Sequence, residues 1–222
     1  MNKIILKKFR NNNEIFLKCI KILKKEIKNN NNIIISGGNT YLEFFKLLKE
    51  KVVNCKINFY ISDERILKTP KIKINLYNIK KSFLNLEKKV KFFFDIEKYN
   101  ISNKLFLLKK IFKEFNKKKT KINLAFLGVG VDGHIASIFD NNIVNAVKEP
   151  FFLSKNKHEK FQRISFTFDY LKEVDQIIFV ITGSDKKYLI ENLKKNNYSK
   201  DIVFFNFLKK TNSKIKIFYA KK

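Results

Sequence analysis

The sequence predicts an α/β fold: a single Rossmann-like domain over residues 1–222, with a mostly parallel sheet flanked by helices. Three observations support this prediction. Short β-branched runs alternate with longer amphipathic segments, which is the pattern of successive βαβ units. No internal repeat, proline-rich or serine-rich linker or change of composition divides the chain. With 222 residues, one core can bury roughly 70% of the surface of the unfolded chain.

The first half of the chain is predicted to alternate between helices and strands. Apolar residues at helical spacing predict an amphipathic helix over 12–28 as the first element. The run "IIIS" at 33–36, followed by two glycines, is typical of a buried parallel strand. Thr40 and Glu43 then fit the capping box that starts a helix. The next two expected elements are a strand over 57–62 and a helix over 76–86.

The second half continues this alternation, and in such sheets ligands bind beyond the carboxyl ends of the strands. Apolar residues at helical spacing predict another helix, marked by Leu105, Leu108, Phe112 and Phe115. The elements expected after it are strands over 122–128 and 175–183, a helix over 185–195 capped by Ser184 or Asp185, and strands over 202–207 and 214–220.

The formal charge is +28, from 48 Lys and Arg against 20 Asp and Glu, which makes a nucleic-acid-binding protein one alternative. The lysines occur in nearly every segment, however, together with abundant Asn, Ile and Phe, and all four residue types have A/T-rich codons. We interpret the charge as a drift in composition. Specific binding would instead require a clustered basic face and a strong salt dependence.

The cysteines and the N-terminus indicate the compartment. Cys19 and Cys55 form neither a disulfide framework nor a zinc motif, so a reducing environment is expected. The basic N-terminus has too short an apolar run for a secretory signal, and no stretch of about 18 apolar residues could span a bilayer. We therefore expect a cytoplasmic protein with no membrane partner.

Glycine is scarce, with 6 residues in 222 against a usual share of about 7%. The six glycines lie in three places, each directly after a predicted strand, where a positive φ or a close approach to a ligand favours glycine. This concentration predicts one composite site at one edge of the sheet. The three positions are Gly37-Gly38, then Gly128, Gly130 and Gly133, and finally Gly183.

Two of these loops carry candidate functional groups. The "SGGNT" loop precedes a helix whose free N–H groups and dipole suit a phosphate, although a tight turn without a ligand is the alternative. The second loop holds Asp132 and His134, a carboxylate and a potential general base. "YISDERI" places Asp63 and Arg65 after another strand, where a surface ion-paired turn is the alternative. His158 is expected to be a solvated bystander among lysines.

Taken in order, "SGGNT", "DERIL…INLYN", "LGVGVDGHIASIF", "QRISFT" and "VITGSDKKYL" resemble the 6-phosphogluconolactonases, which share a fold with the glucosamine-6-phosphate deaminases and isomerases. The resemblance covers about residues 10–205, and the "LGxGxDGHxAS" element is its most specific part. It implies hydrolysis of 6-phosphoglucono-δ-lactone to 6-phosphogluconate in the pentose phosphate pathway, without a metal or organic cofactor.

The resemblance also implies roles for individual residues. His134 would deprotonate the attacking water and return a proton to the ring oxygen, and Asp132 would orient it. Donors near the tetrahedral oxyanion, such as backbone N–H groups of the glycine loop, would stabilise its charge. The phosphate would be held by Gly37, Gly38, Asn39 and Thr40 together with Arg163 and Lys186, and the sugar side would be lined by Asp63, Arg65 and Asn75.

Departures from the family pattern bear on the alternatives. The family often has proline, serine and proline at the positions of Tyr41, Ile74 and Val131, and a longer C-terminal end than "FYAKK". The related deaminases carry "GHIAFNEP", with a glutamate where this chain has Phe139, which favours the lactonase. A decayed enzyme is a further alternative. We expect a monomer or weak homodimer that acts on a small-molecule sugar phosphate and binds no specific nucleic acid.

Overall fold

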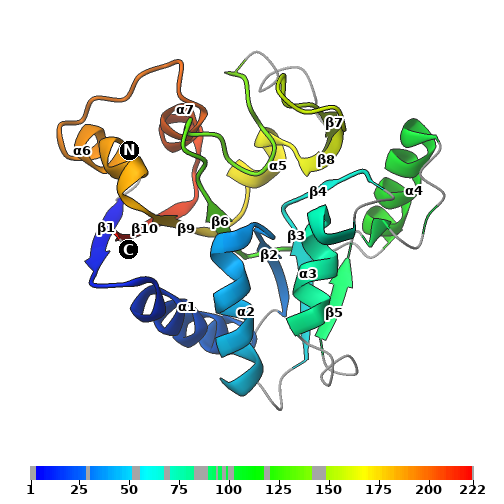
Figure 1. Ribbon diagram of the computed structural model, residues 1–222, viewed down its shortest axis with the longest axis horizontal. Helices are drawn as coiled ribbons and strands as arrows, with labels where there is room; N and C mark the ends of the chain where they lie inside the picture. Colours follow the sequence, from blue (N-terminus) through cyan, green and yellow to red (C-terminus); the bar gives the residue numbers. More distant parts are fainter. Residues whose placement is uncertain are drawn as a thin grey trace.

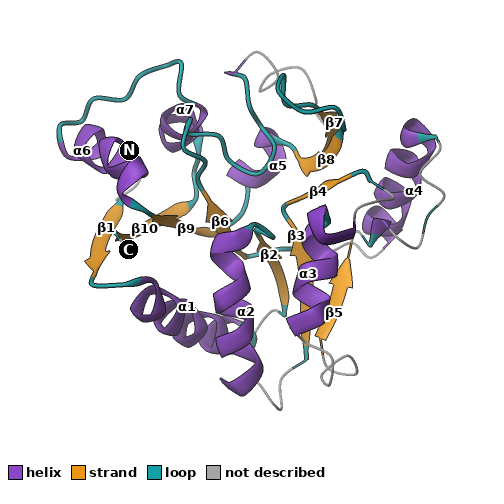
Figure 2. Ribbon diagram, in the orientation of Figure 1, coloured by secondary structure: helices purple, strands orange, loops and turns teal. Residues whose placement is uncertain are grey.

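A computed structural model of the chain gives a large parallel sheet between two layers of helices, with a smaller sheet at one edge (Figures 1 and 2). Within the described part of the chain, no helix is both long enough and apolar enough to cross a bilayer. The described residues are 4–28, 31–51, 56–67, 71–82, 90–93, 95–96, 99, 103–117, 121–141 and 149–221.

The central sheet has seven strands in the order β1-β10-β9-β6-β2-β3-β5, and every pair of neighbours is parallel. The prediction of a mostly parallel sheet is therefore confirmed. Its four central strands, from β9 to β3, are mostly apolar and buried, as expected where helices cover both faces. The bounds are β1 (Ile5–Phe9), β10 (Lys214–Ala220), β9 (Gln176–Thr182), β6 (Leu124–Gly128), β2 (Asn32–Ile35), β3 (Ile57–Ile61) and β5 (Val90–Phe93).

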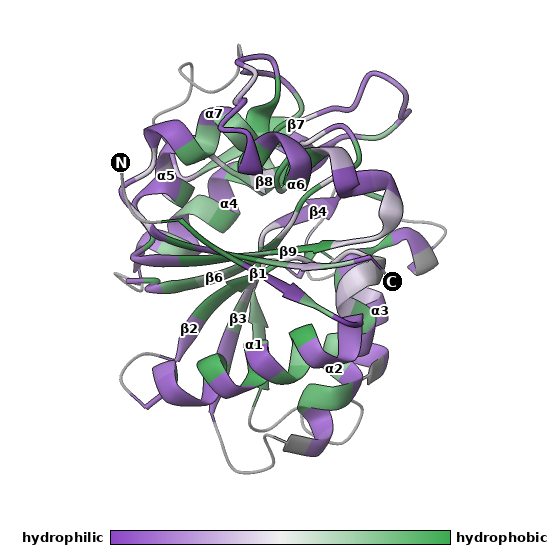
Figure 3. Ribbon diagram, turned by 90° about the vertical axis from the view of Figure 1, so that its left-hand side faces the viewer, coloured by the Kyte–Doolittle hydropathy of each residue, from purple (hydrophilic) through white to green (hydrophobic). Residues whose placement is uncertain are grey.

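Helices lie on both sides of this sheet (Figure 3). On one side, α1 (Asn12–Glu26) and α2 (Asn39–Lys51) pack beside each other, and the α2 side chain of Phe44 contacts Phe126 of β6, with ring centroids 5.9 Å apart. On the other side, Phe204 of α7 meets Phe179 of β9 at 5.0 Å. The remaining helices are α3 (Asn75–Ser82), α4 (Lys104–Lys117), α5 (Phe168–Lys172), α6 (Lys187–Lys194) and α7 (Val203–Lys210).

A second, antiparallel sheet has the order β4-β8-β7. Its first strand, β4 (Asp63–Arg65), follows β3 after the single residue Ser62. β4 pairs with β8 (Arg163–Phe166), which also pairs with β7 (Phe151–Ser154). None of these three short strands was predicted. Their pairing brings "DER" and "RISF" together from opposite halves of the chain.

The strand order places a topological switch point between β2 and β6. From β2 the chain continues outward to β3 and β5, whereas from β6 it continues the other way, to β9 and β10. In open parallel sheets, ligands bind where the loops at the carboxyl ends diverge in this way. The "SGG" loop follows β2 and the Asp132/His134 loop follows β6, so both predicted loops flank the switch point (Figure 1).

Two expectations about whole elements are wrong. The chain opens with the strand β1, not with a helix. The segment 202–207, expected to be a strand, forms most of α7 instead. Its apolar run contains pairs four residues apart, such as Phe204 and Leu208, both of which are buried. A run this apolar fits a buried strand or a buried helix, and packing against β9 selects the helix.

Other expectations about helices are wrong in detail. Thr40 lies inside α2 rather than at its cap. Ser184 and Asp185 belong to a short 3-10 turn that precedes α6, and neither caps that helix. On α4, Leu105 is 64% exposed, because the buried face runs through Leu107 and Ile111. The expected helix over 76–86 begins at Asn75, and its last residues, like Cys55, lie outside the described residues.

Candidate functional site

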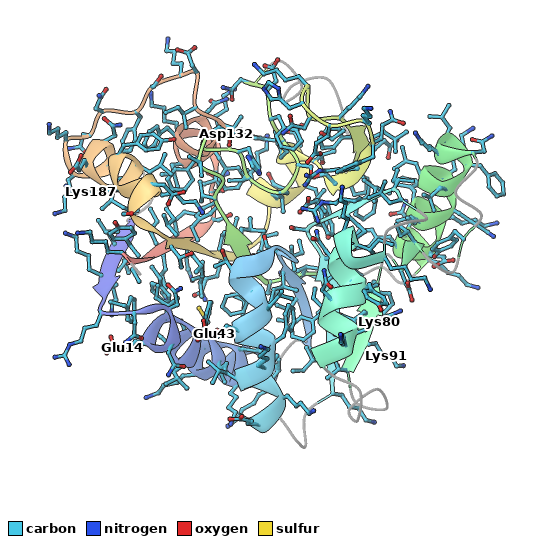
Figure 4. The ribbon with its side chains drawn as sticks, viewed as in Figure 1. Glu14, Glu43, Lys80, Lys91, Asp132 and Lys187 are labelled. Carbon is cyan, nitrogen blue, oxygen red and sulfur yellow. The ribbon has the colours of Figure 1, made fainter. Side chains whose placement is uncertain are left out.

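The loop after β6 holds His134 against Asp132. The distance from His134 Nδ1 to Asp132 Oδ1 is 2.5 Å, and the backbone N–H of His134 donates to the same oxygen at 3.2 Å. The imidazole is 28% exposed and the carboxylate 61% exposed, so solvent reaches both side chains. The hydrogen bond to His134 lowers the pKa of Asp132 to about 2. Figure 4 labels Asp132 at the outer end of this loop.

The charge state of Asp132 determines the tautomer of His134. A carboxyl group with a pKa of about 2 is ionised near neutral pH and can only accept hydrogen bonds. The hydrogen between the two side chains must therefore belong to Nδ1 of His134. In the neutral imidazole the lone pair is then on Nε2, which is the arrangement that a general base requires.

Backbone hydrogen bonds and two helices hold this loop in place. Gly130 N donates to His134 O at 2.9 Å, and Gly133, whose φ is +81°, donates to Gly130 O at 3.1 Å. From α7, Phe204 N donates to Gly133 O at 3.0 Å, and from α6 the Tyr188 hydroxyl donates to Val131 O at 2.6 Å. The segment 202–207, as part of α7, thus supports the histidine loop. The strand predicted for this segment gave no indication of this role.

The loop after β2 has two glycines with different surroundings. A Cβ on Gly37 would lie 2.5 Å from the Cβ of Asn75, so close packing against α3 requires glycine there. A Cβ on Gly38 would meet no heavy atom within 4 Å, and Gly38 has no positive φ. The protein's own packing therefore gives no reason for glycine at this exposed position, which begins the turn into α2. Close approach of a ligand would give one.

The phosphate loop lies beside the end of β9. Thr40 Oγ1 is 3.4 Å from Thr182 Oγ1, the last residue of β9. Lys186 follows four residues later and is partly buried, and its ammonium forms no hydrogen bond or ion pair within the described part of the chain. Burial lowers its pKa, although the charge of Asp185 raises it. A partly desolvated ammonium without a partner is suited to a bound anion.

Asp63 and Arg163 meet across the small sheet, 100 residues apart in sequence. Asp63 Oδ2 accepts hydrogen bonds from Ser137 Oγ at 2.5 Å and from Arg163 Nη1 at 3.3 Å, while its Oδ1 accepts one from Ser62 Oγ at 2.9 Å. The carboxylate is buried with these three donors. It therefore anchors Arg163 and the segment around Ser137, which follows the histidine loop.

Glu64 organises the start of α3. Its carboxylate accepts from the backbone N–H groups of Arg65 at 2.7 Å, Asn75 at 2.9 Å and Leu76 at 2.7 Å. The Asn75 side chain in turn donates to Asp63 O at 3.1 Å, and Arg65 Nη1 donates to Lys73 O at 2.6 Å. These hydrogen bonds bring Arg65 and Asn75 to the same place.

Phe139 connects the two halves of the site. Its ring centroid lies 4.8 Å from that of His134, and the Arg163 guanidinium lies 5.6 Å from the same ring. His134 and Arg163 are thus separated by a single aromatic side chain. From the sequence, Phe139 was noted only because the related deaminases have a glutamate at this position. Its contact with Arg163 was missed, since nothing in the sequence places residue 139 beside residue 163.

The predicted site residues fall into two groups. Asp132 and His134 lie after β6, Gly37, Gly38, Asn39 and Thr40 lie after β2, and Lys186 lies after β9. Asp63, Arg65, Asn75 and Arg163 gather around the small sheet, next to the end of β3. His158 is exposed, as expected for a bystander. Among the residues described, no group of three or more His, Cys, Asp or Glu side chains is placed to hold a metal ion.

The pKa of Glu64 leads to a testable prediction. Burial raises it from 4.5 to about 7, outweighing the three backbone donors. Because the folded-state pKa lies above the ordinary value, the stability from the protonated form is complete below about pH 4.5 and is lost as pH rises through about 7. Urea unfolding at about pH 5 and about pH 8 should show this loss in the wild type and not in Glu64→Gln. Parallel pH dependences in the two proteins would contradict the assignment.

Comparison with known proteins gives a consistent result. A family model described as glucosamine-6-phosphate isomerases/6-phosphogluconolactonase matches residues 12–206. A 6-phosphogluconolactonase of Thermotoga maritima is 29% identical over 169 residues, which cover 72% of this chain and 73% of the relative. A glucosamine-6-phosphate deaminase of Mycoplasma mycoides is 26% identical over 213 residues, covering 86% and 84%. The crystal structure of a Thermotoga maritima 6-phosphogluconolactonase has the same fold, with a TM-score of 0.80 at 21% identity over 99% of this chain and 100% of that one.

Proposed function

The chain belongs to the family of glucosamine-6-phosphate isomerases and 6-phosphogluconolactonases, and we propose that it is a 6-phosphogluconolactonase. The observation that carries the proposal is the pairing of His134 with an ionised Asp132 on a loop that flanks the same switch point as the "SGG" loop. The names of relatives such as the Thermotoga maritima enzyme support the same substrate. The reaction is the hydrolysis of 6-phosphoglucono-δ-lactone to 6-phosphogluconate.

In this proposal His134 acts first as a base and then as an acid. Nε2 takes a proton from water as the water oxygen bonds to the lactone carbonyl carbon, and the carbonyl oxygen becomes an oxyanion. When the bond to the ring oxygen breaks, Nε2 returns the proton to that oxygen. Asp132 keeps Nδ1 protonated and stabilises the imidazolium between these two steps.

Three backbone N–H groups of the histidine loop already have acceptors, so the oxyanion needs other donors. The N–H groups of Gly130 and Gly133 donate to carbonyls within the loop, and that of His134 donates to Asp132. The backbone donors that we expect from the glycine loop therefore do not include these three N–H groups. The N–H groups of Arg65 other than Nη1, which donates to Lys73 O and Asn75 Oδ1, are candidates on the sugar side.

In this proposal the phosphate binds over the "SGG" loop and the first turn of α2. It lies between Thr40 and the two cations Lys186 and Arg163. The unexplained glycine at 38 supports this placement, as does the partnerless, partly buried ammonium of Lys186. Asn39 begins α2 and would contribute through its backbone. Arg65 and Asn75 would line the sugar side, and Asp63 would act by anchoring Arg163.

The sugar-phosphate deaminase is less well supported as a function for this site. In that alternative a glutamate takes part in proton transfer, whereas here the corresponding side chain is the ring of Phe139, packed against His134. We also propose that the protein acts in the cytoplasm as a monomer or weak homodimer. Nothing about the site requires nucleic acid, and retention of activity at high salt without it would agree with this view.

The direct test is hydrolysis of freshly generated 6-phosphoglucono-δ-lactone by the purified protein, measured above the spontaneous rate. Glucosamine-6-phosphate should be tested in parallel for release of ammonia. Lactone hydrolysis without deamination is the expected result. A rate no faster than that of buffer would refute the lactonase, and ammonia release would favour the deaminase instead.

Gly38→Ala should weaken substrate binding without lowering the stability of the fold. The added methyl meets no protein atom within 4 Å, so thermal stability should be unchanged or slightly higher, by about 0.4–1 kcal/mol. If the phosphate approaches the backbone here, the methyl will hinder it and KM will rise, by about tenfold for a lost contact of about 1.4 kcal/mol. Steady-state kinetics with a melting curve would check both. An unchanged KM would remove Gly38 from the phosphate site.

A further inference from the structure

All three guanidinium nitrogens of Arg163 donate to carboxylates. Nε and Nη2 donate to the two oxygens of Glu159, at 2.9 and 2.5 Å, while Nη1 donates to Asp63. The guanidinium is only 10% exposed. Two carboxylates thus surround one cation, which leaves the local charge negative. A phosphate dianion cannot approach this cation favourably while both carboxylates stay in place.

Asp63 is the fixed member of this group. It is 9% exposed and accepts hydrogen bonds from Ser62 and Ser137 in addition to Arg163. Moving it would leave two hydroxyl groups and a guanidinium without their acceptor in a buried environment, which is costly. Asp63 therefore stays with Arg163 whether or not a ligand is bound.

Glu159 is the displaceable member. Its side chain is 24% exposed, more than twice the exposure of Asp63, and it lies in the loop between β7 and β8. Its carboxylate accepts only from Arg163 among the described residues. A carboxylate that swings away from this position reaches water, so its displacement does not leave a buried charge without a partner.

Arg163 does not depend on Glu159 for its position. Its guanidinium lies over two rings, 5.6 Å from the centroid of Phe139 and 5.7 Å from that of Phe161. Asp63 holds it from a third direction. Removal of the Glu159 charge should therefore leave the cation where it is, with its Nε and Nη2 hydrogens free for another bidentate acceptor.

We propose that Glu159 is an internal competitor of the substrate's phosphate group: it fills the bidentate side of Arg163 when the site is empty and must leave when a phosphate binds. This inference rests on the proposed function only in placing the phosphate at Arg163. Glu159 thereby sets the affinity of the phosphate subsite. It also provides an anion that can take the place of the product's phosphate on release.

The test is a titration of the purified protein with inorganic phosphate by calorimetry, at fixed pH and low ionic strength, and then with 6-phosphogluconate. Glu159→Gln should bind both ligands more tightly, with Kd lower by about two- to tenfold, the effect of removing one partly exposed competing charge. KM for the lactone should fall in parallel. The matched control Glu173→Gln removes the same charge from an exposed position at the end of α5 and should leave Kd unchanged. Arg163→Ala should weaken phosphate binding.

The direction in which Kd for phosphate changes in Glu159→Gln distinguishes competition from positioning. If Glu159 only positions Arg163, Glu159→Gln will bind phosphate more weakly or equally well, and either result overturns the proposal. Retained phosphate affinity in Arg163→Ala also overturns it, because there would be no competition for that cation. These titrations need no turnover, so a protein that binds phosphate as expected but hydrolyses no lactone would refute the proposed function and leave the competition intact.

Discussion

His134→Ala is expected to lower kcat for the lactone by about 10²–10⁴-fold, the usual contribution of a positioned general base. Nε2 of the neutral imidazole is the atom proposed to take the proton, since the ionised Asp132 is bound to Nδ1. KM should change little, because the imidazole is not assigned to the phosphate. Stopped-flow or pH-indicator assays on fresh lactone, corrected for spontaneous hydrolysis, would measure the loss.

Two controls make the His134 result specific. The same variant should raise the pKa of Asp132 from about 2 toward its ordinary value, because the hydrogen bond from His134 is the main cause of the depression. A carboxyl ¹³C titration would show this shift. In the wild type, Asp132 stays ionised across the assay range, so the pH–rate profile should contain no step from it. A His134→Ala protein with wild-type kcat would rule out this histidine as the base.

The sequence predicted the fold where local pattern and burial agree. Runs such as "III" before Ser36 and "IIFVI" before Gly183 are buried on both faces of a parallel sheet, and only a strand between helical layers suits them. Segment 202–207 is equally apolar, but its identity as a helix depends on contacts with Phe179 of β9, which no local pattern contains. The small sheet was missed because its strands are short and its pairing is long-range.

For the site, the sequence predicted chemistry better than geometry. Glycine scarcity indicated the loops after β2, β6 and β9, where the structure places several of the candidate residues and where several glycines face a steric limit. The partners of Arg163 could not be predicted, since Asp63 lies 100 residues away and Glu159 is one acidic residue among twenty. Nor could the contact of Phe139 with both His134 and Arg163, which requires the loop after β6 to fold back over β8.

Gly130→Ala is expected to remove most of the activity without unfolding the protein. A Cβ at this position would lie 2.2 Å from Nδ1 and 2.3 Å from Cε1 of His134, and 2.7 Å from Oδ1 of Asp132. Gly130 has no positive φ, so its backbone accepts alanine. The imidazole, at the end of a side chain, is therefore what moves. A displacement of about 1 Å from the productive geometry can cost about 10²-fold, and we expect at least that loss in kcat.

The matched control for Gly130→Ala is Gly128→Ala, two residues earlier. There the added methyl would lie 3.7 Å from Tyr41 and 4.0 Å from Ser36 Oγ, which are ordinary contacts. Its N–H would still donate to Ser36 Oγ, as it does now at 3.0 Å. Urea midpoints of both variants should stay close to the wild type, with kcat reduced only in Gly130→Ala. Equal activity in the two variants would show that contact between His134 and Asp132 is not required for turnover, whereas a large loss of stability in Gly130→Ala would show that the loop, and not the imidazole, gives way.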